Sequence, residues 1–210
     1  MYIAHRINTL EELKNTEAIE FDVRDSNGIC IVQHDPFKEG IPLDIFLNEF
    51  LLTRVKGQGQ GQGQFLIVNI KSEGIEATVF AMLKERGIED FFMLDCTVPV
   101  MYKYTQKGEK RFAVRLSEVE PLEFVRQWKG RVNWVWVDCF SKNILTLPVE
   151  QELHSLGFKI CVVSPELQGR YEEIEIYAKA FQDSGIEVDA ICTKSYNIDK
   201  WKKYYFRDIL

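Results

Sequence analysis

The amino-acid sequence predicts an α/β protein, folded as a distorted (β/α)8 TIM barrel with a β-hairpin extension after strand 2. Three observations support this prediction. Short apolar runs alternate with amphipathic stretches along the 210 residues, one Asn-Gly turn interrupts the alternation, and ionisable residues recur where the apolar runs end. A doubly wound open sheet is the alternative architecture, because it requires the same alternation of strands and helices.

The strand candidates are apolar runs rich in Val, Ile, Phe and Trp, most of them bounded by Gly, Pro, Asp or Asn. Such runs are typical of strands that are buried on both faces of a parallel sheet. In chain order they are Tyr2–Arg6, Ala18–Val23, Ile29–Gln33, Phe65–Lys71, Phe91–Asp95, Phe112–Leu116, Trp134–Cys139, Lys159–Ser164 and Val188–Thr193.

The second and third strand candidates are too close together for a parallel crossover. Only a short polar segment ending in Asn27 and Gly28 separates them, and Asn-Gly favours a tight hairpin turn. Removing this returning arm leaves eight strands, which is the number in a (β/α)8 barrel. The length fits one domain over residues 1–210.

Amphipathic stretches separate most of the strands. The stretch Ile75–Arg86 places Ile75, Val79 and Leu83 on one helical face and precedes Gly87, a typical helix end. The Gly-Gln repeat of residues 57–64 is low in complexity, and we expect it to form a surface loop. The other predicted helices are Leu43–Leu52, Leu122–Trp128, Val149–Leu156, Glu172–Gln182 and Asn197–Tyr205.

The composition excludes several classes of partner. A net charge of −6, from 26 Lys+Arg against 32 Asp+Glu, argues against nucleic-acid binding. No apolar run approaches the ~20 residues of a membrane-spanning helix, and no signal peptide is visible. The five cysteines form no C-x-x-C pair, which disfavours a zinc cluster and indicates reduced thiols in the cytoplasm.

Ionisable residues gather at the carboxyl ends of the predicted strands, where barrels of this class carry their chemistry. Glu20 and Asp22 share one face of a strand because side chains alternate, and so do Asn69 and Lys71. Two neighbouring carboxylates need a cation or protons to coexist. With the amide oxygen of Asn69 they form a set of hard oxygen ligands that suits Mg²⁺ or Ca²⁺ and does not suit zinc.

Two histidines and two cations are predicted at the same edge. His5 and His34 each follow a strand, and an imidazole can act as general acid or base at neutral pH. Arg6 and Lys71 add fixed positive charge for an anionic group.

Polar residues at the later strand ends have two interpretations of equal weight. They could bind the alcohol part of a substrate, for which hydroxyl-rich groups such as glycerol or sugars would be suitable, or they could form salt bridges within the barrel. The candidate substrate-binding residues among them are Arg115, Asp138 and Glu166.

Together these residues resemble the signature of the glycerophosphodiester phosphodiesterases, which belong to a superfamily of phosphatidylinositol-phospholipase-C-like barrels. The resemblance covers about the first 71 residues, and the later strands agree only in their rhythm. The matching segments are His5-Arg6, Ile19–Val23, Gly28, Ile31–Asp35 and Val68–Lys71.

The resemblance implies an activity and a role for each residue. The expected reaction is metal-dependent hydrolysis of a glycerophosphodiester or a related polyol or sugar phosphodiester. His5 and His34 would be the general acid and base, Lys71 would neutralise developing charge, and Arg6 would contact the phosphate. The expected metal ligands are Glu20, Asp22 and Asn69.

The sequence also departs from the family pattern. Asn69 stands where the family carries an acidic metal ligand, Ile7 stands where it carries glycine, and the insertion after His34-Asp35 is very short. A catalytically weakened barrel that binds a phosphate ligand is therefore one alternative. An unrelated barrel enzyme, such as a phosphosugar isomerase with Glu166 as its base, is another.

Overall fold

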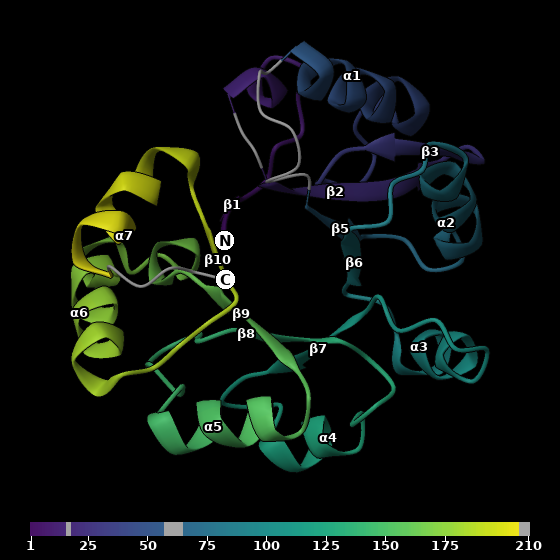
Figure 1. The fold of residues 1–210 in the computed structure, drawn as a ribbon. Helices are drawn as coiled ribbons and strands as arrows, with labels where there is room; N and C mark the ends of the chain where they lie inside the picture. Colours follow the sequence, from purple (N-terminus) through teal and green to yellow (C-terminus); the bar gives the residue numbers. More distant parts are fainter. Residues whose placement is uncertain (16–17, 57–64, 206–210) are drawn as a thin grey trace. The chain divides into compact units, whose positions relative to one another are not determined.

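The computed structural model describes residues 1–15, 18–56 and 65–205 (Figure 1). Its chain forms two compact units. We call Ala4–Val100 the N-terminal unit, and Met1–Ile3 together with Met101–Leu210 the C-terminal unit. The predicted loop of residues 57–64 lies outside the described residues, and the assignment of residues 1–210 to one domain stays a prediction.

The N-terminal unit is built around β2 (Ala18–Ser26), which pairs with β3 and β5. The pairing with β3 is antiparallel and the pairing with β5 is parallel, and each of these strands adds one further neighbour at its other edge. The remaining elements of this unit are β3 (Ile29–Val32), β4 (Ile41–Pro42), β5 (Leu66–Ile70), β6 (Phe91–Leu94), η1 (Glu12–Asn15), α1 (Leu43–Lys56) and α2 (Glu76–Glu85).

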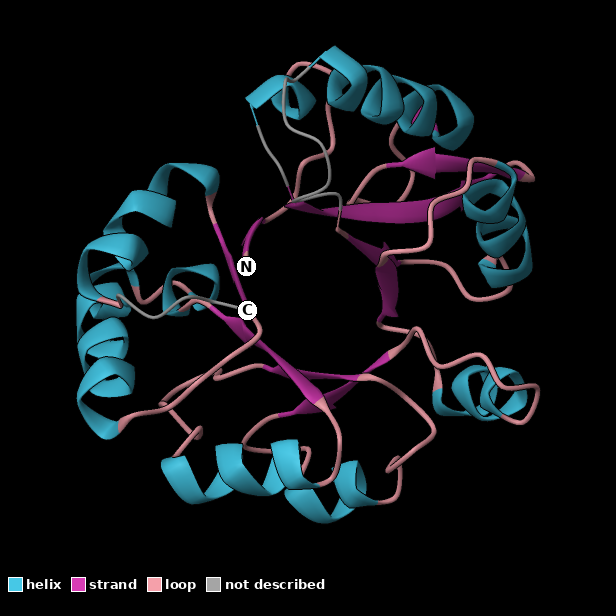
Figure 2. Ribbon diagram, viewed as in Figure 1, coloured by secondary structure: helices cyan, strands magenta, loops and turns pink. Residues whose placement is uncertain are grey.

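The C-terminal unit is a parallel sheet whose strands alternate with helices (Figure 2). Its strands lie in the order β7, β8, β9 and β10, and β1 follows β10. The elements are β1 (Tyr2–Ala4), β7 (Ala113–Leu116), α4 (Leu122–Arg126), β8 (Trp134–Val137), α5 (Leu147–Ser155), β9 (Lys159–Val163), η2 (Pro165–Gln168), η3 (Tyr171–Glu173), α6 (Ile174–Ser184), β10 (Ala190–Thr193), η4 (Ser195–Asn197) and α7 (Ile198–Tyr204).

The predicted hairpin is confirmed. Ser26 of β2 pairs with Ile29 of β3, and both turn residues have left-handed backbones, with φ of 53° at Asn27 and 82° at Gly28. Two consecutive left-handed residues form the tight turn that matches the twist of the flanking strands.

Among the strands and α-helices, β4 and α3 (Val98–Thr105) were not predicted. The strand β4 has only Ile41 and Pro42, too short to leave a period in the sequence. The helix α3 carries Pro99 in its first turn, where the missing N–H of proline costs nothing. Most of the predicted strands extend one or two residues beyond the observed strand ends, because the prediction includes residues that follow the last ladder pair.

The helix layer determines which face of β2 carries the polar residues. The buried ring of Phe21 packs against Phe46 of α1, with centroids 4.8 Å apart. Because side chains alternate along a strand, Glu20 and Asp22 lie on the opposite face, away from α1. Among the described residues, no helix is both long enough and apolar enough to cross a membrane.

Candidate active site

Two carboxylates are buried side by side on the face of β2 that points away from α1. Glu20 and Asp22 are 0% and 1% exposed. Arg6 contacts both: its backbone N–H donates to Glu20 Oε2 at 2.7 Å, and its Nε lies 3.8 Å from Asp22 Oδ2. The segment that follows β1 therefore closes over the two acids.

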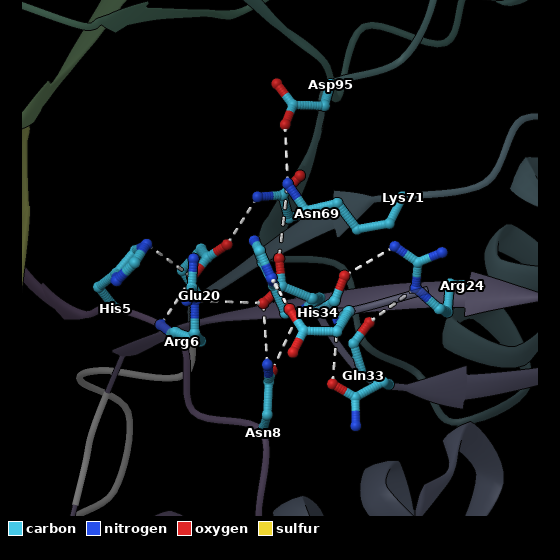
Figure 3. A network of polar contacts seen from close by, with 12 residues as sticks. His5, Arg6, Asn8, Glu20, Arg24, Gln33, His34, Asn69, Lys71 and Asp95 are labelled. Atoms are coloured by element: carbon cyan, nitrogen blue, oxygen red, sulfur yellow. Dashed lines mark hydrogen bonds and ion pairs between the residues drawn. The ribbon is translucent and has the colours of Figure 1, made fainter. Parts of the chain in front are cut away.

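Asn69 joins this pair from the neighbouring strand. It stands in register with Asp22 in the parallel ladder of β2 and β5. Its Nδ2 donates a hydrogen bond to Glu20 Oε1 at 2.8 Å (Figure 3). Its Oδ1 is buried and accepts no hydrogen bond from the residues that the structure describes. A buried carbonyl oxygen of this kind is costly unless it meets a donor or a cation.

Asp22 is held by an amide and by a cation. The side chain of Asn8 forms two hydrogen bonds with it, Nδ2 to Asp22 Oδ2 at 2.8 Å and the Asp22 backbone N–H to Asn8 Oδ1 at 3.0 Å. On the other side, Lys71 Nζ lies 3.6 Å from Asp22 Oδ1.

Lys71 also forms an ion pair with Asp95, at 3.0 Å, just beyond the end of β6 (Figure 3). Asp95 has φ of 59° and Arg6 has φ of 56°, so two residues of this cluster adopt the left-handed backbone that non-glycine residues rarely occupy. Strained backbones concentrate at functional sites, where surrounding contacts hold them.

Glu20 carries a perturbed acidity. Complete burial, reinforced by the negative charge of Asp22, raises the pKa of Glu20 from 4.5 to about 7. Hydrogen bonds from Asn69 and Arg6 and the charge of Lys71 oppose this rise without cancelling it. The charge of Lys71 therefore does not offset the burial of the two carboxylates.

His5 contacts a carboxylate directly, whereas His34 is connected to the carboxylates through the backbone pairing of its segment. His5 Nε2 lies 3.7 Å from Glu20 Oε2. The Gln33 backbone N–H donates to the carbonyl oxygen of Asp22 at 3.1 Å, which extends the hairpin ladder to the residue before His34. Figure 3 shows Glu20 contacted by His5 on one side and by Asn69 on the other.

The His34 ring and backbone are both fixed by neighbours. Its Nδ1 lies 2.8 Å from Asp35 Oδ1, and hydrogen bonds from His34 and then from Lys38 lower the pKa of Asp35. Arg24 Nη2 donates to the His34 carbonyl oxygen at 2.7 Å, and Arg24 Nε donates to the Gln33 carbonyl oxygen at 3.3 Å.

The structure thus brings together within the N-terminal unit the residues predicted as catalytic groups, metal ligands and phosphate contact. Sequence reasoning missed three supporting residues: Asn8, Arg24 and Asp95. Arg24 carried a usable signal, since it shares the face of β2 with Glu20 and Asp22. Asp95 also carried a signal, since it ends the predicted strand Phe91–Asp95, whereas Asn8 acts from a loop, whose geometry no periodicity predicts.

The other predicted substrate-binding residues lie in the C-terminal unit. Arg115 Nη1 lies 3.8 Å from Asp138 Oδ2, and Gln168 Nε2 donates to Asp138 Oδ1 at 2.7 Å. Glu166 is buried and accepts hydrogen bonds from the hydroxyls of Ser164 and Thr193, and also from the backbone N–H of Lys194. The contacts of Glu166 link the ends of β9 and β10. A role in substrate binding stays a prediction for Arg115, Asp138 and Glu166.

The donor set at β2 and β5 fits a hard divalent cation. Two carboxylates and one orphaned amide oxygen offer the oxygen atoms that Mg²⁺ or Ca²⁺ requires. A cation would also oppose the effects of burial and of the Asp22 charge, which together raise the pKa of Glu20. Across the described ranges, no three His, Cys, Asp or Glu side chains are placed to hold a metal ion. The predicted set therefore depends on Asn69 for its third ligand.

Three of the five cysteine thiols are poorly suited to competing chemistry as nucleophiles. Burial is the main cause that raises the pKa of Cys30, Cys96 and Cys139. A thiol with a raised pKa is a poor nucleophile at neutral pH.

Comparison with solved structures shows the fold. A candidate glycerophosphoryl diester phosphodiesterase from Agrobacterium tumefaciens matches 98% of this chain and 98% of its own, with a TM-score of 0.67 at 14% identity. A candidate glycerophosphodiester phosphodiesterase from Galdieria sulphuraria covers 98% and 94%, with a TM-score of 0.64 at 16% identity. The glycerophosphodiester phosphodiesterase from Thermotoga maritima covers 91% and 93%, with a TM-score of 0.60 at 18% identity.

Neither a protein-family model nor a curated protein sequence matches the chain. At 14–18% identity, the likeness to the solved structures establishes the fold alone. The predicted fold class is thereby confirmed, and the resemblance found in the first 71 residues holds at the level of the fold.

Proposed function

We propose that this chain, which shares its fold with glycerophosphodiester phosphodiesterases, is a phosphoric diester hydrolase. Its proposed substrate is a glycerophosphodiester or a related polyol or sugar phosphodiester. The observation that carries the proposal is the convergence of Glu20, Asp22 and Asn69 with Lys71 and two histidine segments in one compact unit. The acidic net charge and the scattered cysteines support a small-molecule substrate and a cytoplasmic location.

Each residue has a defined task in this proposal. Arg6 and Lys71 supply the positive charge that attracts the phosphate and meets the charge that builds as the ester bond breaks. A bound Mg²⁺ or Ca²⁺ would add a Lewis acid for the phosphoryl oxygens, with Glu20, Asp22 and Asn69 as its ligands.

The two histidines would move the protons. One takes a proton from the attacking hydroxyl or water, and the other protonates the alcohol that leaves. With Nδ1 of His34 hydrogen-bonded to Asp35, Nε2 is the nitrogen that exchanges a proton with the substrate. The ionised Asp35 fixes the orientation of the ring, as an orienting carboxylate does for other catalytic histidines.

Hydrolysis of glycerophosphocholine and of bis(p-nitrophenyl) phosphate tests the proposal. We expect turnover by the purified chain, suppression by EDTA, and recovery on addition of Mg²⁺, Mn²⁺ or Ca²⁺. Turnover that EDTA leaves unchanged would remove the cation from the proposal. Absence of turnover with every cation would remove the hydrolase assignment.

Replacing Lys71 by methionine should lower kcat/KM by roughly 10²–10³, because one donor aimed at developing charge contributes about that factor. Lys71 is also the cation between Asp22 and Asp95, so those carboxylates would lose their shared partner. Lys179→Met is the matched control, since Lys179 pairs with Glu175 on α6. Steady-state kinetics of both variants measure the difference, and equal activity in the two would contradict the role given to Lys71.

A catalytically weakened barrel that binds a phosphate ligand is the second candidate function. Asn69 favours it, because this neutral side chain directs its NH₂ group at Glu20 and adds no negative charge. Calorimetry with glycerol 3-phosphate would then show binding where the hydrolysis assay shows no product.

A further inference from the structure

Arg24 extends the row of polar residues along β2. Because side chains alternate along a strand, Arg24 lies on the same face as Glu20 and Asp22, two positions after Asp22. Its backbone is fixed by the hairpin, where it stands in register with Ile31 of β3. The side chain is half-buried, and a guanidinium withdrawn from water needs hydrogen-bond acceptors. Its partners therefore indicate its role.

The partners of Arg24 are two consecutive backbone carbonyl oxygens. Its Nη2 donates to the His34 carbonyl oxygen at 2.7 Å, and its Nε donates to the Gln33 carbonyl oxygen at 3.3 Å (Figure 3). A planar guanidinium can bind two acceptors at once, and hydrogen bonds from a charged donor are the stronger kind. Arg24 thus holds the peptide units on both sides of the His34 Cα atom.

These contacts begin where strand pairing ends. The strand β3 ends at Val32, and the Gln33 backbone N–H adds one further bond, to the Asp22 carbonyl oxygen at 3.1 Å. His34 follows and lies outside the strand. Arg24 then supplies the side-chain hydrogen bonds that hold the next two carbonyl oxygens, so it continues the attachment of this segment to β2.

The position of His34 is thereby linked to the position of the carboxylates. Asp22 accepts one bond from the His34 segment through its backbone, and Arg24 donates two bonds to it from the same strand. The imidazole contacts Asp35, whose backbone N–H donates to Gln33 Oε1 at 3.0 Å. The backbone conformation that Arg24 stabilises therefore also determines the orientation of the ring.

We propose that Arg24 is a positioning residue, which holds the His34 imidazole where it exchanges a proton with the substrate. The inference rests on the proposed function and adds to it a residue that acts through His34. Misplacing a reacting group by about 1 Å can reduce a rate about 10²-fold. Two hydrogen bonds to the backbone around His34 are a means of preventing such a displacement.

Kinetics of Arg24→Met test this role. Methionine keeps a long flexible stem but donates no hydrogen bond. We expect kcat for bis(p-nitrophenyl) phosphate to fall by roughly 10–10² with little change in KM, because His34 is misplaced while the groups that bind the phosphate remain. Arg24→Lys should recover only part of the loss, because an ammonium group cannot reproduce the planar fork that binds both carbonyl oxygens.

Arg86→Met is the matched control. Arg86 is also half-buried and also lies in the N-terminal unit. It too donates to neutral acceptors, Asn48 Oδ1 at 2.9 Å and the Met82 carbonyl oxygen at 3.1 Å. Its variant should keep the kcat of the unchanged protein. Equal kcat values for the two methionine variants would overturn the proposal, and so would a raised KM at unchanged kcat in Arg24→Met, which would assign Arg24 to substrate binding.

A double-mutant cycle separates positioning of His34 from general support of the fold. If Arg24 acts through His34, adding Arg24→Met to His34→Ala should lower kcat no further. Losses that multiply in the double variant would overturn the proposal, because Arg24 would then act independently of His34.

Proton NMR of the imidazoles separates this inference from the proposed function, since it requires no turnover. The chain has three histidines, and the His34 signal is the one that His34→Ala removes. Arg24→Met should shift the His34 signal and leave that of His154 unmoved. This shift in a chain that hydrolyses no diester would contradict the hydrolase and retain the hold of Arg24 on His34. An unshifted His34 signal in a chain that does hydrolyse a diester would contradict the role of Arg24 and retain the hydrolase.

Discussion

Alanine in place of His34 should lower kcat/KM for a phosphodiester by about 10²–10⁴, the range that a positioned general acid or base contributes. The fold should remain unchanged, since the His34 side chain is 36% exposed and its ring contacts Asp35. The backbone contacts that hold the segment, from Arg24 to two carbonyl oxygens, do not involve the imidazole. Steady-state kinetics across pH 5–9 check the expectation, because losing one proton-transfer group should remove one limb of the pH profile.

His154 provides a closely matched control for this substitution. Its side chain is also 36% exposed and also lies next to carboxylates, Glu150 at 2.7 Å and Asp189 at 3.2 Å. It belongs to α5 of the C-terminal unit and carries no role in the proposed reaction. His154→Ala should keep its activity within about twofold of the unchanged protein. If both alanine variants retained full activity, the general acid–base role of His34 would be wrong.

The fold was predictable where local chemistry acts alone. The Asn27-Gly28 turn determines its own geometry, so the hairpin followed directly from two residues. Strands buried on both faces are recognisable from their apolar runs, as in β8 and β9. The helix α3 escaped prediction because its eight residues are too few to show a clear helical period, and β4 exists only through its pairing with β3.

The candidate site was predictable to the extent that it follows the alternation of strands. Glu20 and Asp22 had to share a face, and the register of β5 then placed Asn69 beside them. The hydrogen bond from Asn8 to Asp22 and the pairing of Lys71 with Asp95 depend on how loops close over the sheet. Those conformations are set by contacts between distant segments, which a single sequence does not encode in any periodicity.

Glutamine in place of Glu20 should stabilise the protein at alkaline pH, although it removes a proposed metal ligand. Burial and Asp22 raise the pKa of Glu20 from 4.5 to about 7, so ionisation of this group opposes folding. The stability that Glu20 contributes is largest below its unfolded pKa, and it is lost as the pH rises from 4.5 through about 7. Above this pH range, ionisation of Glu20 lowers the free energy of unfolding by about 3 kcal/mol, given the size of the pKa rise.

Glutamine avoids the cost of ionising a buried carboxylate, and it can also provide a hydrogen bond to Asn69 Oδ1. Its Oε1 can accept the Arg6 N–H that Glu20 now accepts, and its NH₂ group would face Asn69. If the Asn69 amide turns over, its buried Oδ1, which accepts no hydrogen bond among the described residues, becomes the acceptor for that NH₂ group. The gain at pH 8 therefore has two sources, while at pH 5 the first of them vanishes.

Urea unfolding in EDTA at pH 5 and pH 8 measures the effect. The free energy of unfolding of Glu20→Gln should exceed that of the unchanged protein by up to about 3 kcal/mol at pH 8 and by much less at pH 5. Added Mg²⁺ or Ca²⁺ should raise the thermal midpoint of the unchanged protein and not that of the variant. A variant less stable than the unchanged protein at pH 8 would show that the charged carboxylate is well solvated in the fold.

The same substitution at Glu118 should have the opposite sign, which makes it an internal control. Slight burial of Glu118 favours its neutral form, but N–H groups of residues 140–142 donate to its carboxylate and hold its pKa at about 2. The charged form of Glu118 therefore supports folding at pH 8, and this support is lost only as the pH falls from about 4.5 toward 2. Glu118→Gln should weaken stability at pH 8, so opposite signs at the two glutamates would trace the effect of Glu20→Gln to its burial beside Asp22.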